Sequence, residues 1–157
     1  MIDLDFLQTH SLFGGITRQN LKMIVPLLEE VEFAPGEVII SEGEHGENLY
    51  FIYEGEVEIL KSARRDGREF QESIAVLGPG GTFGEMELID PEPRIASVRA
   101  REKTLLLSLS NADLYQIYRD NPETFTLLVM NISRIICRRL REMDARMAQA
   151  LCRLEPA

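Results

Sequence analysis

The sequence predicts a mainly β fold with flanking helices, and three observations support this. Hydrophobic residues recur every three or four positions near the N-terminus and again along a longer C-terminal segment. Between them, from residue 33 to about 109, short β-branched and aromatic runs alternate with glycine-containing turns. The chain has 157 residues, of which 45% are hydrophobic, so we expect a single domain, 1–157, with one main core.

Composition and charge exclude several functional classes. No apolar run approaches the ~18 residues of a membrane span, and the N-terminus lacks the basic start and apolar stretch of a signal peptide. We therefore expect a cytoplasmic protein that does not bind a membrane. A formal charge of −9 disfavours nucleic-acid binding by this chain itself. Two cysteines, Cys137 and Cys152, are too few for a disulfide framework, so buried or idle thiols are expected.

The first 31 residues predict one or two short helices. Apolar residues of the segment "LKMIVPLLEEV", residues 21–31, have helical spacing, and Thr17 is a candidate N-cap. Pro26 predicts a kink or an early end of this helix, because proline removes a backbone donor and clashes with the preceding turn.

The segment 32–109 predicts short strands joined by tight turns. Expected strands include residues 38–40, 49–53 and 57–60, and Asp66-Gly67 predicts the turn of a hairpin. A last strand at about 95–100 is expected to pair with residues 104–109. Strands this short and this regularly spaced predict a sandwich or a jelly roll.

Residues 110–154 predict helices, with Asn121-Pro122 ending one helix and starting the next. Along the last helix an apolar stripe recurs every three or four residues: Phe125, Val129, Ile132, Ile136, Leu140, Met143, Met147 and Leu151. We expect this stripe to form a homodimer, since half of the helix has no obvious domain surface to cover. The alternative is that the helix packs along its own β domain.

The loop "GGTFGEMELIDPEPR", residues 80–94, has the features of an anion site. Its glycines allow close approach of the backbone to a ligand, and "EMELI" can form one helical turn that exposes backbone amides. Arg94 can close over the same anion with a bidentate fork, and Glu85 can accept from a sugar hydroxyl. The alternative is a surface turn whose arginine merely pairs with Asp90 or Glu92.

The residues "FGEMELIDPEPRIASVRA", 83–100, resemble the phosphate-binding cassette of the cyclic nucleotide-binding domain family. That pattern is roughly F-G-E-L-A-L-I, a short variable loop, P-R, two small residues and S/T-V-x-A. Upstream, the segment 33–59 is similar to the first strands of the family, notably at Gly36, Gly43, Gly46 and Gly55. The likeness extends over about residues 6–150.

This resemblance implies a double-stranded β-helix, or jelly roll, with N-terminal helices and a long C-terminal helix. It also implies cAMP or cGMP as ligand, with Glu85 accepting from the ribose 2′-hydroxyl and Arg94 pairing with the cyclic phosphate. The residues whose backbone amides are implied as phosphate donors are Gly84, Met86, Glu87, Ile95 and Ala96. Lining of the base pocket is implied for Ile74, Val76 and Leu77, with Arg139 of the lid helix near the purine.

The chain departs from the family pattern at two positions. Glu87 stands where a small residue is usual, and a carboxylate ~5 Å from a phosphate costs about 3 kcal/mol at an effective dielectric constant of 20. Ile95 lacks the hydroxyl that often marks a guanine preference, which favours cAMP slightly over cGMP. We therefore expect a regulatory sensor that signals through movement of the C-terminal helix. The alternative is a degenerate jelly roll that dimerises or binds partners but no longer binds nucleotide.

No enzyme is expected. The stretch "EGEHGE", residues 42–47, resembles a metal site, but His10 and His45 are the only histidines, and metal-using jelly rolls normally cluster two or three. Many relatives carry a winged helix-turn-helix after the dimer helix, and this sequence stops at Ala157. Two alternatives follow: the protein acts through another partner, or it acts through a further domain.

Overall fold

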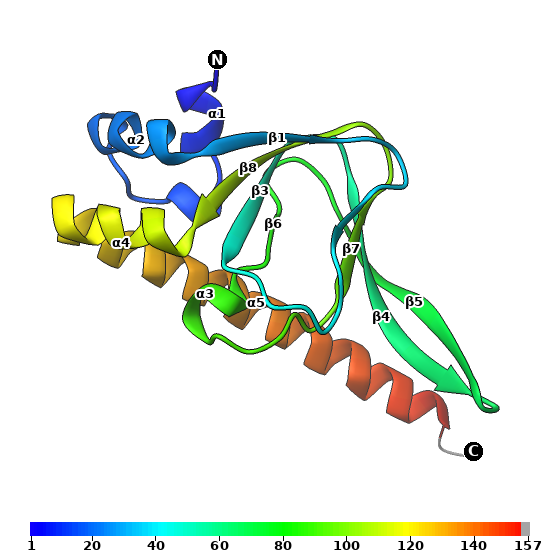
Figure 1. Cartoon of the computed structure of the whole chain (residues 1–157). Helices are drawn as coiled ribbons and strands as arrows, with labels where there is room; N and C mark the ends of the chain where they lie inside the picture. The colour runs from blue at the N-terminus through cyan, green and yellow to red at the C-terminus, as the bar shows by residue number, and fades with distance from the viewer. Residues whose placement is uncertain (155–157) are drawn as a thin grey trace.

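The computed structural model describes residues 1–154 and consists of a β roll with the N-terminal helices at one end and a long C-terminal helix that runs along it (Figure 1). The helices are α1 (Leu4–Gln8), α2 (Arg18–Ile24), α3 (Met86–Ile89), α4 (Asn111–Asp120) and α5 (Pro122–Leu154), with 3₁₀ turns η1 (Ser11–Phe13) and η2 (Val25–Leu27). The strands are β1 (Glu29–Phe33), β2 (Val38–Ile40), β3 (Asn48–Glu54), β4 (Val57–Arg65), β5 (Arg68–Leu77), β6 (Thr82–Phe83), β7 (Ser97–Ala100) and β8 (Thr104–Ser110). Positions 155–157 of the expected domain lie outside the described residues.

The strands form two antiparallel sheets of four strands, in the orders β1-β8-β3-β6 and β2-β7-β4-β5. This arrangement confirms the predicted jelly roll with N-terminal helices and a long C-terminal helix. Between the sheets lies an apolar cluster that includes Ile52, Val57, Phe83 and Leu106. A second, larger cluster joins the outer face of the first sheet to the helices, with Phe51 packed edge-on against the ring of Phe13. The helices are therefore fixed to the roll by apolar packing.

The N-terminal helices end earlier than the apolar spacing predicts. Thr17 caps α2 as expected, by accepting from the amide of Asn20 at 3.3 Å. However, α2 ends at Ile24, Pro26 lies in the 3₁₀ turn η2, and β1 begins at Glu29. The roll thus starts three residues before the predicted boundary at residue 32, because the proline stops the helix and the next residues pair with β8.

The predicted hairpin is confirmed, and one predicted strand pairing is wrong. Asp66 and Gly67 have φ values of 52° and 75°, the combination that a two-residue turn requires, and they connect β4 to β5. Strand β7, however, pairs with β2 and β4, whereas β8 pairs with β1 and β3. The short connection at 101–103 crosses from one sheet to the other, as consecutive strands of a jelly roll do.

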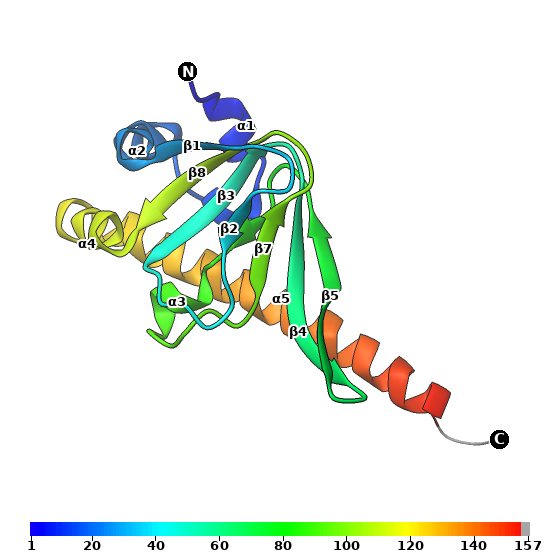
Figure 2. The ribbon, with the colours of Figure 1, turned by 45° about the vertical axis from the view of Figure 1, so that its right-hand side comes forward.

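Helix α5 passes along the roll and continues beside the β4–β5 hairpin (Figure 2). The buried residues of its first half are Thr124, Leu128, Asn131, Ile132 and Ile135. Asn131 fixes this half to the N-terminal segment by donating to the carbonyls of Leu12 and Gly14, at 3.0 and 2.8 Å. The prediction that Ile132 belongs to a dimer stripe is therefore wrong, since its side chain is 0% exposed within its own domain.

Candidate functional site

The site is built where α3 follows β6 (Figure 1) and where the loop from β2 to β3 approaches the side chain of Arg94. Gly84 has a φ of +75°, and a Cβ at this position would lie 2.7 Å from both Nη1 of Arg94 and the carbonyl oxygen of Asn48. Only glycine allows this close approach. The predicted helical turn is confirmed as α3, which begins at Met86 directly after Glu85.

Arg94 is buried, with only 6% of the residue exposed, and its guanidinium is held on several sides. Nη1 donates to the carboxylate of Glu87 at 2.8 Å and to the carbonyl of Gly84 at 3.2 Å. Nη2 donates to the carbonyl of Asn48 at 2.9 Å. The carboxylate partner of Arg94 is thus Glu87, and not Asp90 or Glu92, which are both exposed.

The loop between β2 and β3 is pinned against Arg94 by its backbone. The amide of Arg94 donates to the carbonyl of Glu44, and the amide of Gly43 donates to the carbonyl of Arg94, both at 2.8 Å. A Cβ on Gly46 would lie 2.4 Å from Nη2 of Arg94, so only a glycine fits here. Loop and cassette therefore form one enclosure around the guanidinium.

Glu85 is the most buried ionisable side chain of the cassette, with 1% of the residue exposed. Its Oε1 accepts from Nη1 of Arg139, which comes from α5, while its Oε2 has no hydrogen-bond partner within residues 1–154. Burial raises the pKa of the Glu85 carboxyl, and Arg139 opposes that shift without cancelling it. An unsatisfied acceptor in such a place is costly, and it is suited to a hydroxyl donor from a ligand.

Two arginines one heptad apart attach the second half of α5 to the roll. Arg139 donates to Glu85 and to the carbonyl of Thr82, and Arg146 donates to the carbonyl of Ile74 at 2.6 Å. At 3.6 residues per turn, the positions 139 and 146 lie within about 20° of each other around the helix. The side of α5 that faces the roll is therefore apolar in the first half of the helix and carries arginines in the second half.

The other residues expected at the site differ in how deeply their side chains are buried. Ile74 and Leu77 are half-buried on β5, and Leu77 packs against the cluster between the sheets. Val76 is 45% exposed and pairs with Glu58, so strand alternation puts it on the opposite face from Leu77. Ile95 is 53% exposed, and Ala96 is half-buried. The structure thus brings Leu77 to the interior but not Val76.

Sequence reasoning missed the carbonyl groups that complete the site. The carbonyls of Asn48 and Thr82 accept from Arg94 and Arg139, respectively. Every residue carries a carbonyl, so neither contact has a sequence signal. Gly46, by contrast, was visible as one of the glycines shared with the family pattern, although the sequence did not indicate that it faces Arg94.

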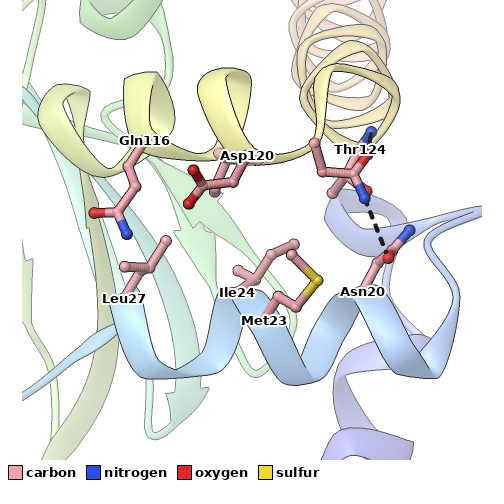
Figure 3. Close-up of a pocket in the computed structure, with 9 residues that line it drawn as sticks. Asn20, Met23, Ile24, Leu27, Gln116, Asp120 and Thr124 are labelled. Atoms are coloured by element: carbon pink, nitrogen blue, oxygen red, sulfur yellow. Dashed lines mark hydrogen bonds between the residues drawn. The ribbon is translucent and has the colours of Figure 1, made fainter.

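A separate small cavity of about 40 Å³ lies between α2 and the junction of α4 and α5 (Figure 3). Asn121 spans it by donating from its side chain to Asn20 at 3.2 Å. Thr124 also lines it, and the Thr124 hydroxyl is buried without a partner. This volume is far below the roughly 300–1,000 Å³ of a typical ligand pocket, so we place the functional site at the cassette instead.

Residues 1–154 contain no group of three or more His, Cys, Asp or Glu side chains arranged to hold a metal ion. Over the same range, no helix combines the length and apolarity needed to cross a bilayer.

The Glu85 carboxyl gives the protein a testable pH dependence. Because its folded pKa is raised, its ionisation opposes folding, and this penalty disappears as pH falls through the folded pKa toward the ordinary value of 4.5. Wild-type protein should therefore gain stability relative to Glu85→Gln as pH is lowered from 7 toward about 4.5. Urea unfolding of both proteins at several pH values measures this difference. Parallel stability curves would contradict it.

Comparison with known proteins places this geometry in a family. Residues 30–121, more than half of the chain, match the family model described as "Cyclic nucleotide-binding domain". In structure, the chain is similar to a cyclic nucleotide-binding domain from Methylobacillus flagellatus, with a TM-score of 0.83 and 26% identity. That match covers 94% of this chain and 81% of the other.

Two curated relatives are bacterial regulators. One is the CRP-like cAMP-activated global transcriptional regulator of Mycobacterium tuberculosis, 30% identical over 147 residues, covering 94% of this chain and 62% of the relative. The other is the cyclic AMP receptor protein of Thermus thermophilus, 33% identical over 133 residues, covering 85% and 58%. The chain thus spans less than two thirds of the length of these relatives.

Proposed function

Because the chain belongs to the cyclic nucleotide-binding domain family, we propose that it is a sensor module that binds a cyclic nucleotide, with cAMP preferred over cGMP. The observation that carries this proposal is the unpartnered Oε2 of Glu85, buried in the same cassette as Arg94. A ribose hydroxyl is a donor that would satisfy this oxygen, and a cyclic phosphate is an anion that suits a guanidinium. The cAMP-activated relatives support the choice of ligand.

The proposed signal passes from the ribose to α5 through one side chain. Arg139 reaches Oε1 of Glu85 from α5, beside the Oε2 that the ribose hydroxyl would satisfy, so a bound sugar and the helix share one carboxylate, and binding of the sugar is expected to rearrange the Arg139 contact. Two contacts hold the second half of α5 to the roll: the Arg139 contact, and the hydrogen bond from Arg146 to the carbonyl of Ile74. Loss or rearrangement of the Arg139 contact changes one of these two attachments. Ligand binding is therefore expected to shift the helix, because it favours the state in which Glu85 faces the sugar.

The preference for cAMP is proposed from Ile95. Its side chain offers no hydroxyl to a guanine and is 53% exposed beside the cassette. The proposal assigns no catalytic step to these residues, in keeping with relatives that are named as regulators.

Thermal melting with nucleotides tests the proposal directly. Ligand at 100 times its Kd should add about 2.7 kcal/mol of stability, so cAMP should raise the Tm of this chain by several degrees, and cGMP by less. Linear 5′-AMP is the matched control, because it keeps the base and ribose but lacks the cyclic phosphate. If millimolar cAMP and cGMP both leave Tm unchanged, the sensor proposal fails and the ligand-free interaction module takes its place.

We also propose that the second half of α5 mediates a homodimer. Leu140, Met143, Met147 and Leu151 are each between 56 and 59% exposed and form a stripe. At 3.6 residues per turn, the centre of this stripe lies about 85° around the helix from Arg139 and about 105° from Arg146, which face the roll. The stripe therefore lies along the side of the helix, next to the face that contacts its own domain, and is available to a second copy.

A charge in the middle of the stripe should dissociate the dimer. Leu140→Glu is expected to give a monomer in sedimentation velocity at a concentration where wild type is dimeric, because burying an unpaired carboxylate is costly. Ala145→Glu places the same charge on an exposed position on the opposite side of α5, and should leave the mass unchanged. An unchanged mass for Leu140→Glu, or a monomeric wild type, would refute the stripe as an interface.

A further inference from the structure

The anion-binding arginine of the cassette already has an anion. Arg94 Nη1 and Glu87 Oε2 lie 2.8 Å apart, and the side chains of the pair are only 5 and 6% exposed. Resting on the proposed function, we propose that Glu87 sets the nucleotide affinity of this chain by competing with the ligand phosphate for Arg94. Glu87 is thereby an internal counter-ion that the phosphate must displace.

The partners of Arg94 differ in how easily they can be replaced. The carbonyls of Gly84 and Asn48 belong to the backbone of the cassette and of β3, respectively. Gly46, in the loop between β2 and β3, lies directly against Nε and Nη2 of Arg94. Glu87 is the one side chain among the hydrogen-bond partners of Arg94 in residues 1–154. It can leave by rotating its own torsions, whereas the carbonyls leave only if the loop opens. An incoming anion therefore meets Glu87 as its competitor.

The charges of the site support this competition. Its two buried carboxylates, Glu85 and Glu87, are matched by two guanidiniums, Arg139 and Arg94. The site is therefore balanced without a ligand, and a phosphodiester adds one negative charge beside Glu87. A buried charge without a partner is strongly disfavoured, so phosphate and Glu87 cannot both hold Arg94 as well as either holds it alone.

The position of Glu87 allows it to leave. It lies in the first turn of α3, a four-residue helix on the surface, whose Met86 and Ile89 are 39 and 50% exposed. Residues that follow α3 in the loop, including Asp90 and Glu92, are also exposed. Solvent thus lies within reach of the displaced carboxylate, so the α3 backbone need not unfold for the exchange.

Isothermal titration of cAMP into wild type, Glu87→Gln and Glu87→Ala tests the assignment. Both variants should bind about tenfold to a hundredfold more tightly than wild type, because they remove the competing charge. Glu92→Gln removes an exposed carboxylate from the same loop and should bind like wild type. The double variant Arg94→Ala/Glu87→Gln should show no such gain, since the competition requires Arg94. Circular dichroism checks that each variant is folded. If Glu87→Gln does not fold, Glu87→Ala provides the comparison with wild type.

The outcomes separate this assignment from the proposed function. Tighter binding by Glu87→Gln or Glu87→Ala than by wild type supports it. If wild type shows no binding and a variant does, the competition by Glu87 is supported, whereas the sensor function of the wild-type chain fails. If wild type binds cAMP and both folded variants bind equally or more weakly, Glu87 is not a competitor, although the sensor function stands. If wild type and both variants fail to bind cAMP and cGMP, both proposals are overturned.

Discussion

Replacing Arg94 with alanine should destabilise the unliganded protein by up to about 3–5 kcal/mol, the cost of a buried Glu87 without its partner, and by less to the extent that the Glu87 side chain rotates out to solvent. The backbone carbonyls of Gly84 and Asn48 would lose their donors in the same step. Chemical denaturation followed by circular dichroism measures the loss. The same variant should also show no Tm increase with cAMP, since the proposed phosphate contact is gone.

Two variants act as controls for this result. Arg94→Ala/Glu87→Ala should be more stable than Arg94→Ala alone, because removing both charges leaves no unpaired ion. Arg99→Ala breaks a more exposed pair with Glu58, in which the arginine side chain is 43% exposed, and should cost less than about 1 kcal/mol. A double variant no more stable than Arg94→Ala would show that the cost comes from lost packing and not from the buried charge.

Replacing Gly84 with alanine should disrupt the cassette through its backbone. Alanine is strained at the φ of +75°, which costs about 1–3 kcal/mol. The new Cβ would also lie 2.7 Å from the Asn48 carbonyl oxygen and from Nη1 of Arg94, so backbone must move. We expect a loss of stability beyond the conformational strain, together with loss of the cAMP-induced Tm increase.

Gly43→Ala separates the two causes. Gly43 has a similar φ of +85°, but a Cβ there would have no neighbour within 4 Å. This variant should therefore show only the conformational cost, and the difference between the two variants, measured by urea unfolding, reports the collision at Gly84. Equal stability losses would mean that the cassette adapts to the extra methyl group without strain.

Local features of the fold could be predicted from the sequence, whereas non-local pairings could not. Asp66-Gly67 and Asn121-Pro122 determine the backbone within a few residues, so the hairpin and the start of α5 are as predicted. The partner of β7 depends on which sheet the chain enters after residue 100, and strand alternation alone carries no such information. The strand β1 likewise replaces predicted helix at residues 29–31 because β8 supplies its hydrogen bonds.

The residue types of the candidate site could be predicted from the sequence, whereas the hydrogen bonds and ion pairs between them could not. Glu85 and Arg94 were expected to face a ligand, and both are buried in the cassette, as such a role requires. Glu87 was expected to offer its backbone amide to the phosphate and to place its charge beside it. Its pairing with Arg94 depends on the direction in which one side chain leaves a single helical turn, which the sequence does not reveal. The carbonyl contacts had no sequence signal at all.

The length of helix α5 determines how far its C-terminal end would move if its contact with the site shifted. Leu154 lies 15 residues beyond Arg139, which is about 22 Å along the helix axis at 1.5 Å per residue. If ligand binding shifts α5 as proposed, and Arg146 releases the carbonyl of Ile74, the contact of Arg139 with Glu85 and Thr82 is the point about which the helix would turn. A tilt of about 5° there displaces Leu154 by about 2 Å, so the C-terminal end of the apolar stripe would move much further than the residues next to Arg139.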